Sequence, residues 1–303
     1  MTGLGGHLDP AAVARFDSLE LVARTLVEGF LKGLHYSAAK GSSTEFAEHR
    51  PYSPGDDIRR IDWRAFARTD RHYVKQYDDE TNVRALLLLD ASASMGFASA
   101  GVTKLRYATC LAAALGYLLH LQRDAVGLAV VGGVGGGPGS REIPPKATAQ
   151  HLRGVFGALE AAVAGGTGDL AASIHRAAEL LHARSLVIVI SDFLEDPAPV
   201  LQSVAHLRHR GAEVILFHIV DPAEEDFPFT HWTIFEDPER PGTRLRVDAR
   251  QVRATYRENL EEHLSILRKG AIALEADYTL FNTSHAFEAA LAAFLAARSE
   301  RSP

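Results

Sequence analysis

Two apolar segments that end abruptly in polar residues constrain this sequence more than any other feature. Residues 83–95, VRALLLLDASASM, pass directly from an apolar run into Asp90, Ser92 and Ser94. Residues 186–192, LVIVISD, end in the same way on Asp192. Short continuous apolar runs of this kind are typical of parallel strands covered on both faces. With helical patterns between them, they predict an α/β fold with a doubly wound, mostly parallel sheet.

The polar residues at the ends of these strands form a candidate metal site. In open α/β sheets, ligands bind beyond the carboxyl ends of the strands. Thr167, in the segment GGTGDL, precedes a predicted helix at the same kind of loop, where it or Asp169 could instead simply cap that helix. Oxygen ligands without Cys or His suit a hard cation such as Mg²⁺. The candidate ligands are Asp90, Ser92, Ser94, Thr167 and Asp192.

In order and context, these five residues resemble the metal-ion-dependent adhesion site of von Willebrand factor A-like (vWA) domains. The resemblance implies that Ser92 and Ser94 bind Mg²⁺, or another hard cation such as Mn²⁺ or Ca²⁺, directly. It implies that Thr167 is a ligand that can move in or out, and that Asp90 and Asp192 are charge partners. Because hydroxyl ligands are neutral, such an ion seeks an anionic ligand, and the resemblance implies that this is a carboxylate from a partner protein. We therefore expect a site that binds rather than cleaves.

The composition limits the class of protein. A length of 303 residues with 47% hydrophobic residues allows one large domain, or one domain with a smaller appendage. The net charge of -6 gives no general attraction to nucleic acid or anionic lipid. The one cysteine, Cys110, lies in an apolar helical pattern and is expected to be buried and inert. Neither a signal peptide nor an apolar run of about 20 residues is found, so we expect a cytoplasmic protein without a membrane span.

The remaining patterns predict the order of the elements. A first helix is expected to start at Asp9 and Pro10 and to continue to Leu34. A β-hairpin, with strands at 232–235 and 245–247 and a turn at PERPG, is expected before a long polar helix. The glycine-rich residues 132–140 are interpreted as a hairpin turn and not a phosphate loop, because no G-K-[ST] follows. Further helices are predicted at 105–121, 148–163, 170–181, 197–210, 250–269 and 286–297, and further strands at 125–131, 141–144, 214–220 and 278–281.

We divide the chain at residue 82. Residues 1–82 would hold the first helix and a small β-rich subdomain, with a strand expected at 72–77. Residues 83–303 would form a vWA-like domain with an inserted hairpin at about 228–248. The dense, mixed charges between Arg50 and Lys75 favour internal ion pairing over a surface for a partner.

The segment 42–82 carries a second resemblance. Its pattern H-R-x-Y-x-x-G-D-D-x-R-x-I-D-W-R, at residues 49–64, followed by the D-x-S-x-S strand, looks like the signature of the domain-of-unknown-function fifty-eight family. These are bacterial proteins with a vWA-like core, often encoded beside MoxR-type AAA+ ATPases. The resemblance implies such an ATPase as partner in a chaperone-like system. The candidate partner-binding residues are Arg50, Asp56, Asp57, Arg59, Asp62, Trp63 and Arg64.

The leading hypothesis is a metal-dependent protein-interaction module that is not an enzyme. A phosphohydrolase of the haloacid-dehalogenase type would need an acidic general acid where Ser92 stands, and no Lys or His stands next to the five site residues. Nucleic-acid binding through residues 50–75 is opposed by the acids among them.

Two further groups of polar residues are interpreted as solvated. The acidic run at 221–226 is expected to be a solvated loop rather than a second cation site. His206 and His209 lie three apart on a predicted helix, but without a third ligand in register they are expected to face solvent.

Overall fold

The computed structural model describes residues 10–16, 18–38, 50–51, 73–74, 83–99, 101–134, 141–181 and 185–299. The chain divides into two compact units. Residues 1–31 and 83–303 form the larger unit, and residues 32–82 form the smaller one. Within the smaller unit, β1 (Arg50–Pro51) pairs antiparallel with β2 (Tyr73–Val74). The rest of the predicted strand at 72–77, and the predicted β-rich subdomain around it, lie outside the described residues.

A six-stranded sheet in the order β10-β7-β6-β3-β4-β5 forms the centre of the larger unit. Five of its strands are parallel, and β5 at one edge pairs antiparallel with β4. The predicted doubly wound, mostly parallel sheet is therefore confirmed. Its strands are β3 (Arg84–Ala91), β4 (Ala125–Gly132), β5 (Arg141–Lys146), β6 (Ser185–Ser191), β7 (Glu213–Val220) and β10 (Asp277–Asn282).

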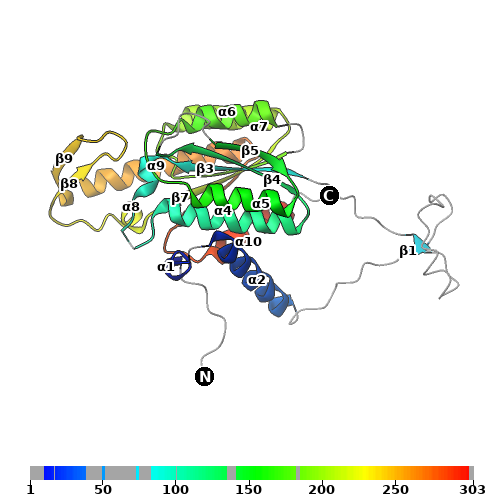
Figure 1. Ribbon diagram of the computed structural model, residues 1–303. Coiled ribbons are helices and arrows are strands. Elements are labelled where there is room, and N and C mark those ends of the chain that lie inside the picture. Colours follow the sequence, from blue (N-terminus) through cyan, green and yellow to red (C-terminus); the bar gives the residue numbers. More distant parts are fainter. Residues whose placement is uncertain are drawn as a thin grey trace, which may run out of the picture. The chain divides into compact units, whose positions relative to one another are not determined.

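Helices cover both faces of this sheet (Figure 1). On β3, Leu87 and Leu89 point to one apolar core, and Leu86 and Leu88 point to the other, as the two-residue period of a strand requires. The first core is closed by α4 (Lys104–Leu121), α5 (Ala149–Glu160) and α10 (Phe287–Ser299). The second core is closed by α6 (Leu170–Leu180), α7 (Pro197–His209) and α9 (Ala249–Ala273).

The N-terminal helix differs from the prediction in two ways. It is broken into α1 (Pro10–Val13) and α2 (Leu19–Ala38), and the Ser18 hydroxyl accepts a hydrogen bond from the Leu21 amide at the start of α2. Its apolar face, which includes Leu26 and Phe30, belongs to the core of the larger unit. Residues up to Leu31 therefore belong with residues 83–303, not with residues 32–82 as the predicted division at residue 82 placed them.

The inserted hairpin is present, with β8 (Trp232–Glu236) antiparallel to β9 (Arg244–Asp248). It lies between the short helix α8 (Pro222–Asp226) and α9, beyond the end of the sheet (Figure 1). β5 pairs antiparallel with β4, whereas residues 135–140 of the predicted glycine-rich turn lie outside the described residues. Among the described residues, no helix is long and apolar enough to cross a membrane.

Candidate functional site

The sheet register places the ends of β3 and β6 side by side. Leu89 of β3 pairs with Ile190 of β6, so the residues that follow each of them, Asp90 and Ser191, are neighbours. The Ser191 hydroxyl donates a hydrogen bond of 2.6 Å to Asp90 Oδ2. The apolar runs that predicted the strands thus also set the position of the first site residue.

Asp90 is a buried carboxylate held by neutral donors. Besides Ser191, the Ser92 amide donates a hydrogen bond of 2.8 Å to its Oδ1. Burial raises the pKa of Asp90 to about 7, and the nearby negative charge of Asp192 adds to the rise, against the opposing hydrogen bonds from Ser191 and Ser92. Among the described residues, Asp90 forms no ion pair.

The two serines follow Asp90 at the start of a short 3-10 turn. Ser92 precedes η2 (Ala93–Gly96), which contains Ser94, and the two hydroxyl oxygens are 3.0 Å apart. Both side chains are buried. The D-x-S-x-S spacing therefore brings a carboxylate and two hydroxyls into one small polar site at the end of the central strand.

The loop of Thr167 passes beside the same turn. Gly166 O accepts a hydrogen bond of 3.1 Å from the Ala93 amide, and a Cβ added to Gly168 would lie 3.5 Å from Asp90 Oδ1. Thr167 itself is exposed, between these two contacts. The cap of α6 is Asp169, whose Oδ1 accepts the Ala172 amide at 2.7 Å. The alternative role of Thr167 as a helix cap is therefore taken by Asp169.

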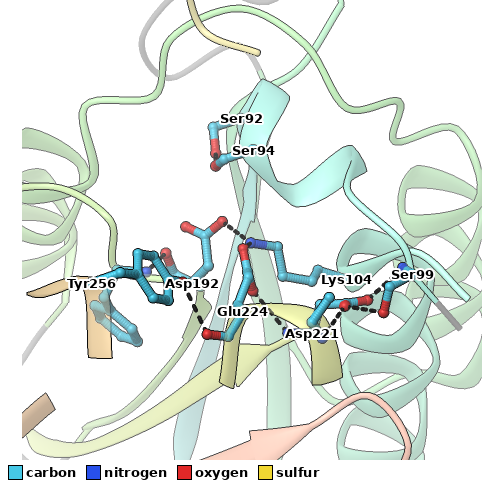
Figure 2. A network of polar contacts seen from close by, with 11 residues as sticks. Ser92, Ser94, Ser99, Lys104, Asp192, Asp221, Glu224 and Tyr256 are labelled. Atoms are coloured by element: carbon cyan, nitrogen blue, oxygen red, sulfur yellow. Dashed lines mark hydrogen bonds and ion pairs between the residues drawn. The ribbon is translucent and has the colours of Figure 1, made fainter. Parts of the chain in front are cut away.

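Asp192 is bound by a lysine that the sequence did not reveal. The Lys104 ammonium at the start of α4 lies 2.8 Å from Asp192 Oδ2 and 2.5 Å from Glu224 Oε1, as Figure 2 shows. Burial alone would lower the pKa of Lys104, but the charges and hydrogen bonds of the two carboxylates outweigh it and raise the pKa. The expectation that no lysine stands beside the site residues is wrong, because the fold joins residues that are 88 positions apart.

The acidic segment after β7 is part of this network. Asp221 is fully buried, caps α8 in a capping box with Glu224, and accepts hydrogen bonds from the amide and hydroxyl of Ser99. Tyr256 of α9 donates a hydrogen bond of 2.9 Å to Glu224 O (Figure 2). The predicted solvated loop is therefore wrong for Asp221 and Glu224, whereas Glu225 and Asp226 are exposed.

These residues fit a hard cation at the Asp90 end of the site. Asp90 offers a buried carboxylate without a cationic partner in the described ranges, and Ser92 and Ser94 offer hydroxyl oxygens beside it. A cation would offset both the burial and the repulsion from Asp192 that raise the pKa of Asp90. Within the part of the chain that the structure describes, no group of three or more His, Cys, Asp or Glu residues could hold a metal ion, so the hydroxyls would be essential ligands.

Other predicted residues are accounted for more briefly. The His206 ring stacks on the His175 ring, with the ring centroids 4.5 Å apart. Cys110 is buried, as expected. Of the candidate partner-binding residues, only Arg50 is described, as part of β1. The others, Asp56, Asp57, Arg59, Asp62, Trp63 and Arg64, lie outside the described residues.

Ser191 and Lys104 were missed by the sequence analysis, and Glu224 was assigned to a solvated loop. Lys104 had one signal, a cation at the first position of a helix that is mostly apolar. Ser191 had no local signal, and the contact of Glu224 with Lys104 had none, because both depend on which strands are neighbours in the sheet.

Uncharacterised proteins of mycobacteria are similar to most of the chain. Relatives from Mycobacterium bovis and Mycobacterium tuberculosis are 29% identical over 262 residues, which is 83% of this chain and 81% of each relative.

Solved structures are similar at lower identity. BatB from Bacteroides thetaiotaomicron has a TM-score of 0.48 and 14% identity, covering 72% of this chain and 99% of that chain. An aerotolerance-related membrane protein from Bacteroides fragilis has a TM-score of 0.47 and 15% identity, over 72% of this chain and 99% of that chain. The VWA domain of SpRpn10 has a TM-score of 0.41 and 12% identity, over 69% of this chain and 93% of that chain.

The family match extends from the segment before the core into the long helix α9. The family described as "Protein of unknown function DUF58" matches residues 48–265, which is more than half of the chain. The chain therefore belongs to the DUF58 family.

Proposed function

We propose that this protein is a protein-interaction module that binds its partner through a divalent cation, with Mg²⁺ as the first candidate and Mn²⁺ or Ca²⁺ as alternatives. Asp90, Ser92 and Ser94 would hold the cation, with Thr167 at the rim as a further ligand. Asp192 would act mainly through its charge. When bound, the cation supplies a position that accepts a carboxylate from the partner.

The observation that carries this proposal is the environment of Asp90. A buried carboxylate is costly unless a cation or a proton neutralises it. The described contacts of Asp90 are two hydrogen bonds from neutral groups, Ser191 Oγ and the Ser92 amide. The Ser92 and Ser94 hydroxyls beside it are the kind of oxygen that a hard cation accepts as ligands.

Because Lys104 pairs with only one of the two aspartates, Asp90 and Asp192 have different roles. Lys104 already compensates Asp192 and Glu224, so the negative charge that remains uncompensated lies at Asp90. When all four groups are ionised, three carboxylates and one ammonium leave two negative charges, which a divalent cation would balance. Asp90 is therefore the residue on which cation binding should depend most.

Binding is better supported than hydrolysis. A phosphohydrolase would need a group that exchanges protons with substrate, and Ser92 stands where an acidic residue would be required. Lys104 is fully buried and bound to two carboxylates, so it is not available to a substrate. The similarity to vWA domains concerns the fold alone, and an interaction module is compatible with that fold.

The partner we propose is a MoxR-type AAA+ ATPase. This choice rests on the family to which the chain belongs and on the resemblance of residues 49–64 to its signature. The ATPase would contribute an exposed Asp or Glu to the cation, and the pair would act together on a client protein.

Cation binding can be tested directly. Mn²⁺ binding to the full chain would be measured by electron paramagnetic resonance and calorimetry, for the wild type, Asp90→Asn and Asp226→Asn. Asp226 is an exposed acid beyond the same sheet edge and serves as the matched control. We expect Asp90→Asn to bind Mn²⁺ at least about tenfold more weakly, with Asp226→Asn unchanged. Equal binding by wild type and Asp90→Asn would overturn the proposal.

Partner binding requires a second measurement. A purified MoxR-type ATPase from the same organism would be titrated against the wild type and Asp90→Asn, with Mg²⁺ and with a chelator. Binding that needs both Mg²⁺ and Asp90 is expected. Binding that persists in the chelator would exclude the cation from the interface.

A further inference from the structure

A pocket of about 230 Å³ lies between α6 and the face of the sheet that α6 covers. Residues of β3, β4, β5 and α6 line it, and all of them belong to the larger unit. Arg84, the first residue of β3, is among them, whereas Asp90 stands six residues further along the same strand, about 20 Å away. The pocket is therefore distinct from the candidate cation site.

Small residues on both walls leave this space open. Ala129 of β4 faces α6, because its neighbours Leu128 and Val130 belong to the core on the opposite face of the sheet. From α6, Ser173 and Ala177 line the pocket. Protein interiors hold few voids larger than a water molecule, so a pocket of this size is a candidate ligand site.

The pocket combines an apolar interior with charged residues that reach solvent. Its buried lining residues are mostly apolar, and they include Leu86, Leu128, Ala177 and Leu181. Its charged lining residues, Arg84 and Glu142, are exposed. A ligand that fits this arrangement has an apolar body and a polar end.

The charge balance determines the sign of that polar end. Glu142 of β5 is paired with Arg176 of α6, with its Oε1 3.4 Å from Arg176 Nε, so its charge is already compensated. The Arg84 guanidinium forms no ion pair or hydrogen bond with a described residue. The three side chains together carry one positive charge, which an anionic group on the ligand would complement. A carboxylate matches the fork of a guanidinium with two parallel hydrogen bonds.

The volume limits the size of the ligand. An apolar cavity of about 150 Å³ takes up benzene, so about 230 Å³ admits a ring or short chain of about nine or ten non-hydrogen atoms. No side chain within a peptide carries both an apolar body of this size and a carboxylate. A free small acid has both, in one short unit.

We propose that this pocket binds a small aromatic or aliphatic carboxylic acid as its anion, with the apolar body between Ala129 and Ala177 and the carboxylate on Arg84. The juxtaposition of an apolar pocket and a guanidinium without an acidic partner in the described chain carries this inference. It goes beyond the proposed function and does not depend on the cation site.

Amide chemical shifts of the ¹⁵N-labelled full chain would be followed as phenylacetate or hexanoate is added, in the presence of a chelator. The uncharged amides, phenylacetamide and hexanamide, are the matched probes without charge. We expect saturable binding of the acids with a Kd of about 1 mM or lower. The amides should bind at least about fivefold more weakly. The largest shifts should fall within residues 84–86, 128–129, 142–143 and 173–181.

Variants separate the charge from the volume. Arg84→Gln should bind the acids at least about fivefold more weakly and the amides as wild type does. Arg257→Gln removes an exposed arginine of α9 and should match the wild type. Ala129→Leu fills the pocket from the sheet and Ala177→Leu fills it from the helix, so each should weaken binding of acids and amides by about tenfold or more. Thermal melts would verify that the variants are folded.

Each possible failure has a distinct meaning. No saturable binding of either acid, or wild-type affinity in folded Ala129→Leu and Ala177→Leu, would overturn the pocket as a ligand site. Equal affinity for acid and amide, or wild-type affinity in Arg84→Gln, would overturn the recognition of a carboxylate.

Two further arms complete the test. A tetrapeptide that ends in phenylalanine presents a ring and a carboxylate at a chain end, and binding about tenfold tighter than that of phenylacetate would overturn the assignment to a free acid. Asp90→Asn should bind the acids as wild type does, so failure of the proposed cation site would leave this result standing.

Discussion

The Lys104 ammonium lies 2.8 Å from Asp192 Oδ2, and both side chains are almost completely buried. Asp192 therefore has a cationic partner supplied by the protein, whereas Asp90, on the neighbouring strand end, has none among the described residues. Two aspartates that resemble one another in sequence context thus differ in electrostatic role. This difference leads to the first prediction.

Replacing Lys104 should destabilise the protein strongly. Lys104→Met leaves Asp192 and Glu224 without their shared cation, and breaking a buried ion pair costs about 3–5 kcal/mol. The free energy of unfolding would be measured by urea denaturation followed by circular dichroism. Arg244→Met, which breaks the exposed pair with Glu236, should cost less than about 1 kcal/mol. A similar loss in both variants would contradict the role given to Lys104.

Gly127 should not tolerate a side chain. It lies on β4 where the pairing with β5 is irregular, and an added Cβ would stand 2.7 Å from Ile143 O and 2.8 Å from Pro145 N. Because both contacts are backbone, Gly127→Ala should lower the unfolding free energy by about 1–3 kcal/mol. Gly154, exposed in α5 with nothing within 4 Å, is the control, and Gly154→Ala should stabilise by about 0.5–1 kcal/mol. Thermal melts should show a lower melting temperature than wild type for Gly127→Ala and a higher one for Gly154→Ala.

His218 should make stability depend on pH in acid. Burial lowers its pKa to about 3, and the positive charges of His263 and Lys104 add to the effect. Between about pH 6.5 and pH 3, His218 binds a proton in the unfolded chain but not in the native protein. The contribution of neutral His218 to the free energy of unfolding is therefore complete above about pH 6.5 and is lost as the pH falls.

The test for His218 is a difference between two proteins, because Asp90, with its raised pKa, titrates with the opposite sign in the cation-free protein. The unfolding free energy of wild type minus that of His218→Gln should fall by about 1.4 kcal/mol between about pH 7.5 and pH 5.5. A difference that stays constant over this range would show that native His218 takes up the proton normally.

Cys110 should be inert in the native protein. It is fully buried in α4, and burial raises its pKa to about 11, so almost no thiolate is present near neutral pH. Ellman's reagent should react with less than about one tenth of the thiol over an hour in buffer and with all of it in urea. Rapid reaction of the folded protein would mean that α4 opens locally.

The sequence predicted the elements better than the contacts between them. The apolar runs of β3 and β6 and the hairpin signals around PERPG are local patterns, and the structure contains these elements. The first helix was predicted as continuous because its apolar spacing runs on, whereas Ser18 starts a new helix after a break. Ser18 is a residue type that caps helices, and this local signal decides against one continuous helix.

The candidate site shows where such reasoning ends. Asp90, Ser92 and Ser94 lie within five residues, so their spacing alone brings them together. Lys104, Asp192 and Glu224 come from three distant segments and meet only because β3, β6 and β7 are successive neighbours in the sheet. Sequence spacing carries no information on that order, so the contact of Lys104 with the two carboxylates could not be predicted from it.

The edge strand β5 has a consequence for how other molecules can attach to this chain. Pro144 and Pro145 lie within it, and proline has no amide hydrogen to offer to an incoming strand. Sheet augmentation, in which a peptide from another molecule pairs with the sheet as an additional strand, is therefore hindered at the β5 edge. A partner that binds at this edge would have to contact side chains instead of pairing with the backbone. Side-chain contacts select partners by their chemistry.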